Sequence, residues 1–179
     1  MSNYLLKYNK YKNMYNDIKL KINQTGGNNQ DRMTISSDFK ENTRIPEKYT
    51  CEGEGFFPEI FVNDIPKETK SLAIIVEDPD APKGLWTHLV AWNIPKENDK
   101  ISFFELKKGN IGQNTTGKNV WTAPCPPAGD SPHRYFFKVF ALDTLLNLPP
   151  NTNADTLKRS MKENILAQSE LVGIFDIES

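Results

Sequence analysis

The sequence predicts a mainly β protein, an antiparallel β-sandwich with a few peripheral helices. Short apolar stretches bounded by Pro and Gly recur from residue 33 onward, as is typical of strands. Only one helical pattern occurs in this part of the chain, so strands do not alternate with helices as they do in parallel sheets. The length of 179 residues suits one domain with its own core, and an additional tail.

Four strands are predicted in chain order. The first, residues 72–76 in "SLAIIVEDPDAP", is apolar at every position, which indicates burial on both faces, and it leaves the sheet at Pro79. The second lies in "GLWTHLVAWNIP" and ends at Pro95, and the third is "RYFFKVFALD". The fourth is "SELVGIFDI", near the C-terminus.

Helical periodicity occurs at both ends of the chain. Near the C-terminus, Thr152 and Asp155 have the form of a capping box, and the apolar stripe that follows is Leu157, Met161 and Ile165. Residues 1–32 are predicted to be an N-terminal extension, either a flexible tail or an amphipathic helix, ahead of a domain at 33–179. The helical alternative depends on a stripe at 4-3-4-3-4 spacing, formed by Tyr4, Tyr8, Tyr11, Tyr15, Ile18 and Ile22.

Composition argues against nucleic-acid-binding, membrane-spanning and secreted proteins. The net charge is −1, so no strong positive field attracts nucleic acid or an anionic membrane. No apolar stretch is long enough for a transmembrane helix, and the N-terminus lacks the apolar region of a signal peptide. We therefore expect a cytoplasmic protein. Cys51 and Cys125 have no metal-ligand spacing, and in a reducing compartment we expect both to be free thiols.

No element is predicted between Phe104 and His133. Loops this long inside a compact domain are usually either functional or disordered. Trp121 and the rigid "APCPPAG" favour an ordered functional loop.

Polar side chains gather at two strand ends. Asp78 and Asp80 are two residues apart, so an extended backbone would aim both carboxylates at the same side. A tight hairpin would bring His88 back beside them. At the start of the third predicted strand, His133 and Tyr135 share one face and Arg134 takes the other.

Several catalytic arrangements do not match these residues. No nucleophile elbow of the form Gly-x-Ser-x-Gly occurs, "GEGFFP" is not a dinucleotide loop, and no zinc motif is present. A mixed metal site of two His and two Asp is a minor alternative. Imidazole and phenol groups beside a Pro/Gly loop fit an anion pocket better.

The chain resembles the phosphatidylethanolamine-binding protein family, also called Raf kinase inhibitor proteins, and in particular its bacterial-type branch. The motifs that carry the resemblance are "DPDAP" followed by His88, and "PCPPAGDSPHRYFFKVFALD". "IPEKYTCEGEG", "VNDIPKETKSLAIIVEDPDAP" and "ILAQSELVGIFD" are also similar to that branch. The resemblance covers about residues 33–176.

The resemblance implies a β-sandwich with a small pocket for phosphate-type anions and phospholipid head groups. It implies no cofactor, no metal and no catalytic residue. A protein kinase or protease inhibited through the protein surface is the alternative function, and a hydrolase that uses the Asp/His cluster is a weaker one. By position, the ligand-binding residues would be Asp78, Asp80, His88, Pro124, Pro126, His133 and Tyr135.

Four positions depart from the family pattern. Leu89 and Val62 stand where Trp is common, Glu59 replaces the second Pro of Ser-Pro-Pro, and Ala123 replaces a Gly before "PCPP". These departures are expected to change the size of the ligand and the shape of the loop more than the existence of the pocket.

Overall fold

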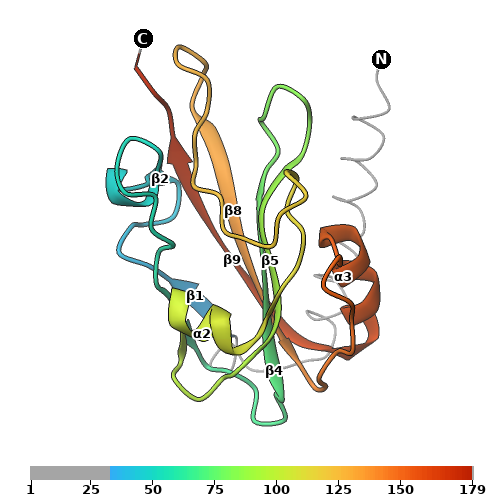
Figure 1. Cartoon of the computed structure of the whole chain (residues 1–179). Helices are drawn as coiled ribbons and strands as arrows, with labels where there is room; N and C mark the ends of the chain where they lie inside the picture. Colours follow the sequence, from blue (N-terminus) through green and yellow to red (C-terminus); the bar gives the residue numbers. More distant parts are fainter. Residues whose placement is uncertain (1–32, 179) are drawn as a thin grey trace.

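The computed structural model describes residues 33–178, and the prediction of a flexible or helical extension at 1–32 lies outside the described residues. Two sheets form the domain (Figure 1). The smaller sheet contains β1 (Thr34–Ser36), β3 (Ile60–Asn63) and β6 (Lys100–Ile101). The larger sheet has the order β2 (Thr43–Arg44), β9 (Ile165–Phe175), β8 (His133–Leu142), β4 (Ser71–Asp78), β5 (Trp86–Ile94) and β7 (Asn110–Ile111). All strand pairs are antiparallel except β2–β9, so the predicted antiparallel β-sandwich is confirmed.

The larger sheet is covered on both faces. Leu72, Ile74 and Val76 of β4 join the core between the two sheets, whereas Ala73 and Ile75 pack beneath helix α3 (Ala154–Met161). Every residue of β4 is buried as a result. This double burial explains why the sequence of β4 shows no alternation of apolar and polar residues.

A buried ion cluster lies on the α3 face of this sheet. Glu77 of β4 accepts a hydrogen bond from Lys138 of β8 at 3.0 Å and another from Lys158 of α3. Burial alone would raise the pKa of Glu77, but the two lysines lower it from 4.5 to about 2. The cluster therefore ties α3 to the centre of the sheet.

The predicted strands are confirmed, with changes at their ends. β4 includes residues on both sides of 72–76, β8 begins one residue earlier at His133, and β9 begins at Ile165. Placing Ile165 on the stripe of the last helix was therefore wrong. This helix is capped by Asn153, whose side chain accepts from the backbone of Thr156 at 3.0 Å, and not by Thr152.

The short strands β1, β2, β3 and β6 were not predicted, and helix α2 (Phe103–Lys108) and β7 lie at the start of the segment in which no element was predicted. Helix α2 begins with a capping box formed by Ser102 and Glu105, and β7 follows it directly. The sequence signal was present, since Ser-x-x-Glu is the capping-box pattern. Within residues 33–178, no helix is long and apolar enough to cross a membrane.

Candidate functional site

Three predicted site residues continue one face of the larger sheet to its end. On β8, Tyr135 and Phe137 belong to the core between the sheets, and His133 has the same parity. On β4, Asp78 has the parity of Val76 in that core. The core face therefore ends in a histidine, a tyrosine and a carboxylate, and Arg134 is exposed on the other side as predicted.

A β-bulge brings His88 to the same face. β5 pairs Leu89 with Val76 and Thr87 with Glu77, so His88 is left as the extra residue of the bulge. Because Leu89 belongs to the core between the sheets, strict alternation would turn His88 away from that face. The bulge instead places the His88 ring against Tyr135, with ring centroids 5.3 Å apart.

The long segment before β8 is ordered by hydrogen bonds, as predicted. The side chain of Asn114 donates to the carbonyl of Val120 and to the hydroxyl of Thr122, and accepts from Thr116. The backbone of Thr122 in turn donates to the carbonyl of His88 at 3.1 Å, and Nδ1 of His88 lies 2.7 Å from the carbonyl oxygen of Thr122. The loop is thus held beside the bulge.

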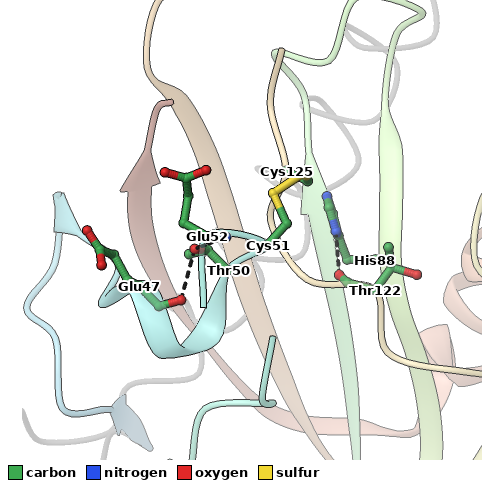
Figure 2. Close-up of a disulfide and its surroundings, with 7 residues drawn as sticks. All are labelled: Glu47, Thr50, Cys51, Glu52, His88, Thr122 and Cys125. Carbon is green, nitrogen blue, oxygen red and sulfur yellow. Dashed lines mark hydrogen bonds between the residues drawn. A yellow bond between two sulfur atoms is a disulfide. The ribbon is translucent and has the colours of Figure 1, made fainter. Parts of the chain in front are cut away.

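A disulfide joins this loop to the turn after η1 (Glu47–Tyr49), a short 3-10 helix, and Figure 2 shows it close to His88. Cys51 and Cys125 are bonded, so the expectation of two free thiols was wrong. The backbone N–H of Cys51 donates to the carbonyl of Pro124 at 3.0 Å. The two Cα atoms lie 5.3 Å apart, within the range that a disulfide needs. Because 74 residues separate the cysteines, spacing alone could not reveal their contact.

These elements line an open cavity of about 280 Å³ at the end of the sheet. Its walls come from the end of β4, the β4–β5 connection, β5, the loop and β8. The lining residues are Asp78, Ala81, Pro82, Lys83, Trp86, His88, Thr122, Ala123, Cys125, Pro126, Pro127, His133 and Tyr135. Five of the seven ligand-binding residues expected from the resemblance are among them, and Asp80 and Pro124 are not.

Asp80 is directed away from the cavity, contrary to the expectation that Asp78 and Asp80 aim at one side. It accepts from the guanidinium of Arg134 at 2.7 and 2.8 Å and from the Arg134 backbone at 3.0 Å. The reason is that β4 ends at Asp78, so the alternation of a strand does not extend to Asp80. The backbone N–H of Asp80 donates to Asp78 at 2.7 Å, so Asp80 supports the site indirectly.

Two carboxylates flank His133 at the cavity. Nδ1 of His133 lies 2.8 Å from a carboxylate oxygen of Asp78, and Nε2 lies 3.7 Å from the carboxylate of Asp130. Burial lowers the pKa of His88, and this effect outweighs its hydrogen bond to Thr122 and the negative charge of Asp78. Burial and the two nearby aspartates raise the pKa of Tyr135, so its hydroxyl keeps its proton.

Sequence reasoning missed part of the cavity wall, and of the four departures from the family pattern one lines the cavity. Lys83 and Trp86 lie in the cavity, and their only signal was their position between "DPDAP" and His88. Among the four departures from the family pattern, Ala123 lines the cavity. Val62 and Leu89 are buried in the core between the sheets, and exposed Glu59 pairs with Lys100.

Comparisons with known proteins agree with this architecture. Residues 35–176 match the family model described as phosphatidylethanolamine-binding protein. A UPF0098 protein of Pyrococcus horikoshii is 40% identical over 159 residues, covering 84% of this chain and 80% of the relative.

Two solved structures have the same fold. A phosphatidylethanolamine-binding protein homologue of Chlamydia trachomatis superposes with a TM-score of 0.76 at 34% identity, covering 83% of this chain and 100% of the other. Escherichia coli YbcL, described as a new member of the mammalian family, gives 0.74 at 26% identity, covering 82% and 99%. The chain belongs to the phosphatidylethanolamine-binding protein family, in its bacterial-type branch.

Proposed function

We propose that this chain is a non-enzymatic binding module whose cavity takes a phosphate-type anion, either a phosphorylated small molecule or a phospholipid head group. The observation that carries the proposal concerns His88. Its Nε2 atom is buried and has no hydrogen-bond partner among residues 33–178, although the ring lines the cavity. Leaving a buried polar atom without a partner costs about 1–3 kcal/mol, which favours a ligand that supplies the partner.

The other groups suit an oxyanion. The hydroxyl of Tyr135 is a hydrogen-bond donor, and His133 can donate when it is protonated beside Asp78. The pairing of Asp78 with His133 limits the repulsion that an unpaired carboxylate would exert on an anion. The cavity, about 280 Å³ in volume, is near the lower limit of small-molecule sites, so it fits a head group rather than acyl chains.

Calorimetric titration with O-phosphorylethanolamine between pH 5 and 8 tests the proposal. We expect His133→Ala to weaken binding about tenfold or more, since a charge-assisted hydrogen bond contributes roughly 1.5–3 kcal/mol. Binding to the unmodified protein should weaken as the pH rises through the range in which imidazoles lose their proton. Binding that is independent of pH and of His133 would contradict the anion pocket.

Asn153→Ala serves as the matched control for His133→Ala. Asn153 caps α3, which packs on the opposite face of the larger sheet from the cavity. A loss of affinity caused only by reduced stability would appear in both variants, whereas loss of a ligand contact would appear in His133→Ala alone.

Two alternatives make different predictions. Hydrolase activity would be seen as turnover of a simple ester that His133→Ala abolishes. Inhibition of a protein kinase or protease through the surface rests on the family resemblance alone, and it would persist in a variant whose cavity no longer binds phosphate. A cytoplasmic location also stays a prediction.

A further inference from the structure

The contact between His88 and the loop determines which ring nitrogen carries a proton. Nδ1 lies 2.7 Å from the carbonyl oxygen of Thr122, and a carbonyl oxygen can only accept. Nδ1 is therefore the donor, and Figure 2 shows this bond with the second nitrogen at the other end of the ring from Thr122. In the neutral imidazole, Nε2 must then be a hydrogen-bond acceptor.

The surroundings of His88 favour this neutral form. A second proton would place an N–H at Nε2, which is buried and has no acceptor within hydrogen-bond distance among residues 33–178. The charged or titratable groups around the ring are Asp78 on β4, His133 and Tyr135 on β8, and Lys83 in the β4–β5 connection. Asp78 is paired with His133, so its negative charge stabilises a protonated His88 only in part. Burial lowers the pKa of His88 despite that charge.

An acceptor at this position has a chemical consequence for the ligand. A fully ionised oxygen would face the lone pair of Nε2 and be repelled, whereas a P–O–H group can donate its proton to it. Buried sites that offer one hydrogen-bonding group discriminate strongly against analogues that cannot complete the bond. Tyr135, which keeps its proton, can donate to another oxygen of the same ligand.

We propose that His88 makes the cavity selective for phosphomonoesters that carry a P–O–H group, over phosphodiesters and sulfate esters of similar size and equal charge. This inference rests on the proposed function and narrows it, because an intact phospholipid head group is a phosphodiester without such a proton. Tyr135 and His133 supply affinity for the anion, and His88 supplies the selectivity.

Three small probes separate these ligand classes in the full-length protein: methyl phosphate, dimethyl phosphate and methyl sulfate. None contains an ammonium group that could donate to Nε2 instead. At pH 5 all three carry about one negative charge, because the second pKa of a phosphomonoester is near 6. We expect methyl phosphate to bind at least about tenfold tighter than the other two in a ¹H–¹⁵N titration. At pH 8 that advantage should disappear, because methyl phosphate has then lost its proton.

Two variants test whether His88 is the residue responsible for the selectivity. In His88→Gln the side-chain amide can present an N–H to the cavity, so dimethyl phosphate and methyl sulfate should gain affinity relative to methyl phosphate. In His133→Ala the three probes should weaken together, because this residue contributes to anion binding without selecting the proton.

Long-range ¹H–¹⁵N spectra of the two histidines test the inference without any ligand or substitution. We expect His88 to be neutral at pH 7 with its proton on Nδ1, and a proton on Nε2 would overturn the inference. Equal binding of the three probes at pH 5 would also overturn it and leave the anion pocket intact. If no probe binds even at high millimolar concentration, the anion pocket itself fails and the inference with it.

Discussion

Replacing Cys51 and Cys125 by serine removes the disulfide, and we expect the protein to lose about 2–4 kcal/mol of its free energy of unfolding. The cysteines are 74 residues apart. In the loop-entropy model, a bridge that closes a loop of this length restricts the unfolded chain by roughly 4.5 kcal/mol at 25 °C. Measured effects are usually smaller than the model value because unfolded chains retain some structure.

Equilibrium unfolding in urea, followed by tryptophan fluorescence, measures this loss. The double variant should unfold at a lower urea concentration with a cooperative transition, and its melting temperature should fall by about 2–4 °C per kcal/mol. Since both cysteines are exposed, a dithiol should shift the unmodified protein to the same midpoint. The double variant is the control, because the dithiol should leave it unchanged.

Two results would refute this reasoning. Two titratable thiols in the native, unreduced protein would show that the bridge does not form. A bridge that forms but changes stability by less than about 0.5 kcal/mol would show that the loop is already restricted in the unfolded chain.

Three further predictions concern other parts of the molecule. Glu77→Gln should lower the free energy of unfolding in urea by about 3 kcal/mol or more, because Lys138 and Lys158 would face a neutral amide inside the protein. Since the pKa of Glu77 is lowered from 4.5 to about 2, its contribution to the free energy of unfolding is fully present above pH 4.5 and is lost as the pH falls toward 2. An acid-unfolding curve that is the same for the variant and the unmodified protein would contradict this. Asn153→Ala should cost about 1 kcal/mol in the same assay, because the first turn of α3 loses its cap, and no change would show that another group replaces the cap. Deleting residues 1–32 should leave the melting temperature nearly unchanged, and a loss of many degrees would show that this segment docks on the domain.

The sequence predicted the strands well because they are long and bounded by clear signals. β4 could be identified from its uninterrupted apolar run and Pro79, and the parity of His133 and Tyr135 followed from the period of a strand. Short elements were harder to predict. β1, β2, β6 and β7 have two or three residues each, too few for any periodicity.

Details of the site depend on contacts that are distant in sequence. The bulge at His88 is a property of the β4–β5 register, so no local pattern reveals it. Asp80 was expected in the cavity from the family resemblance, and an extended backbone beyond Asp78 was assumed to aim both carboxylates at one side. The observed bond to Arg134 depends instead on β8 lying next to β4. The disulfide likewise depends on the loop crossing the turn that holds Cys51.

The position of β8 has a consequence for the rate of ligand association and for the stability of the bound domain. β8 lies inside the larger sheet, between β4 and β9, and it carries His133 and Tyr135. His133 and Tyr135 pair with Phe175 and Gly173 of β9, and over residues 136–142 β8 pairs with both β9 and β4. Backbone amides in this doubly flanked part of β8 should exchange with solvent only when the whole domain unfolds. The wall that β8 forms is then set before a ligand arrives, and its two side chains should reach a ligand without a slow conformational step. A ligand bound to such walls should raise the stability of the entire domain, by about 2.7 kcal/mol at a free concentration of 100 times Kd.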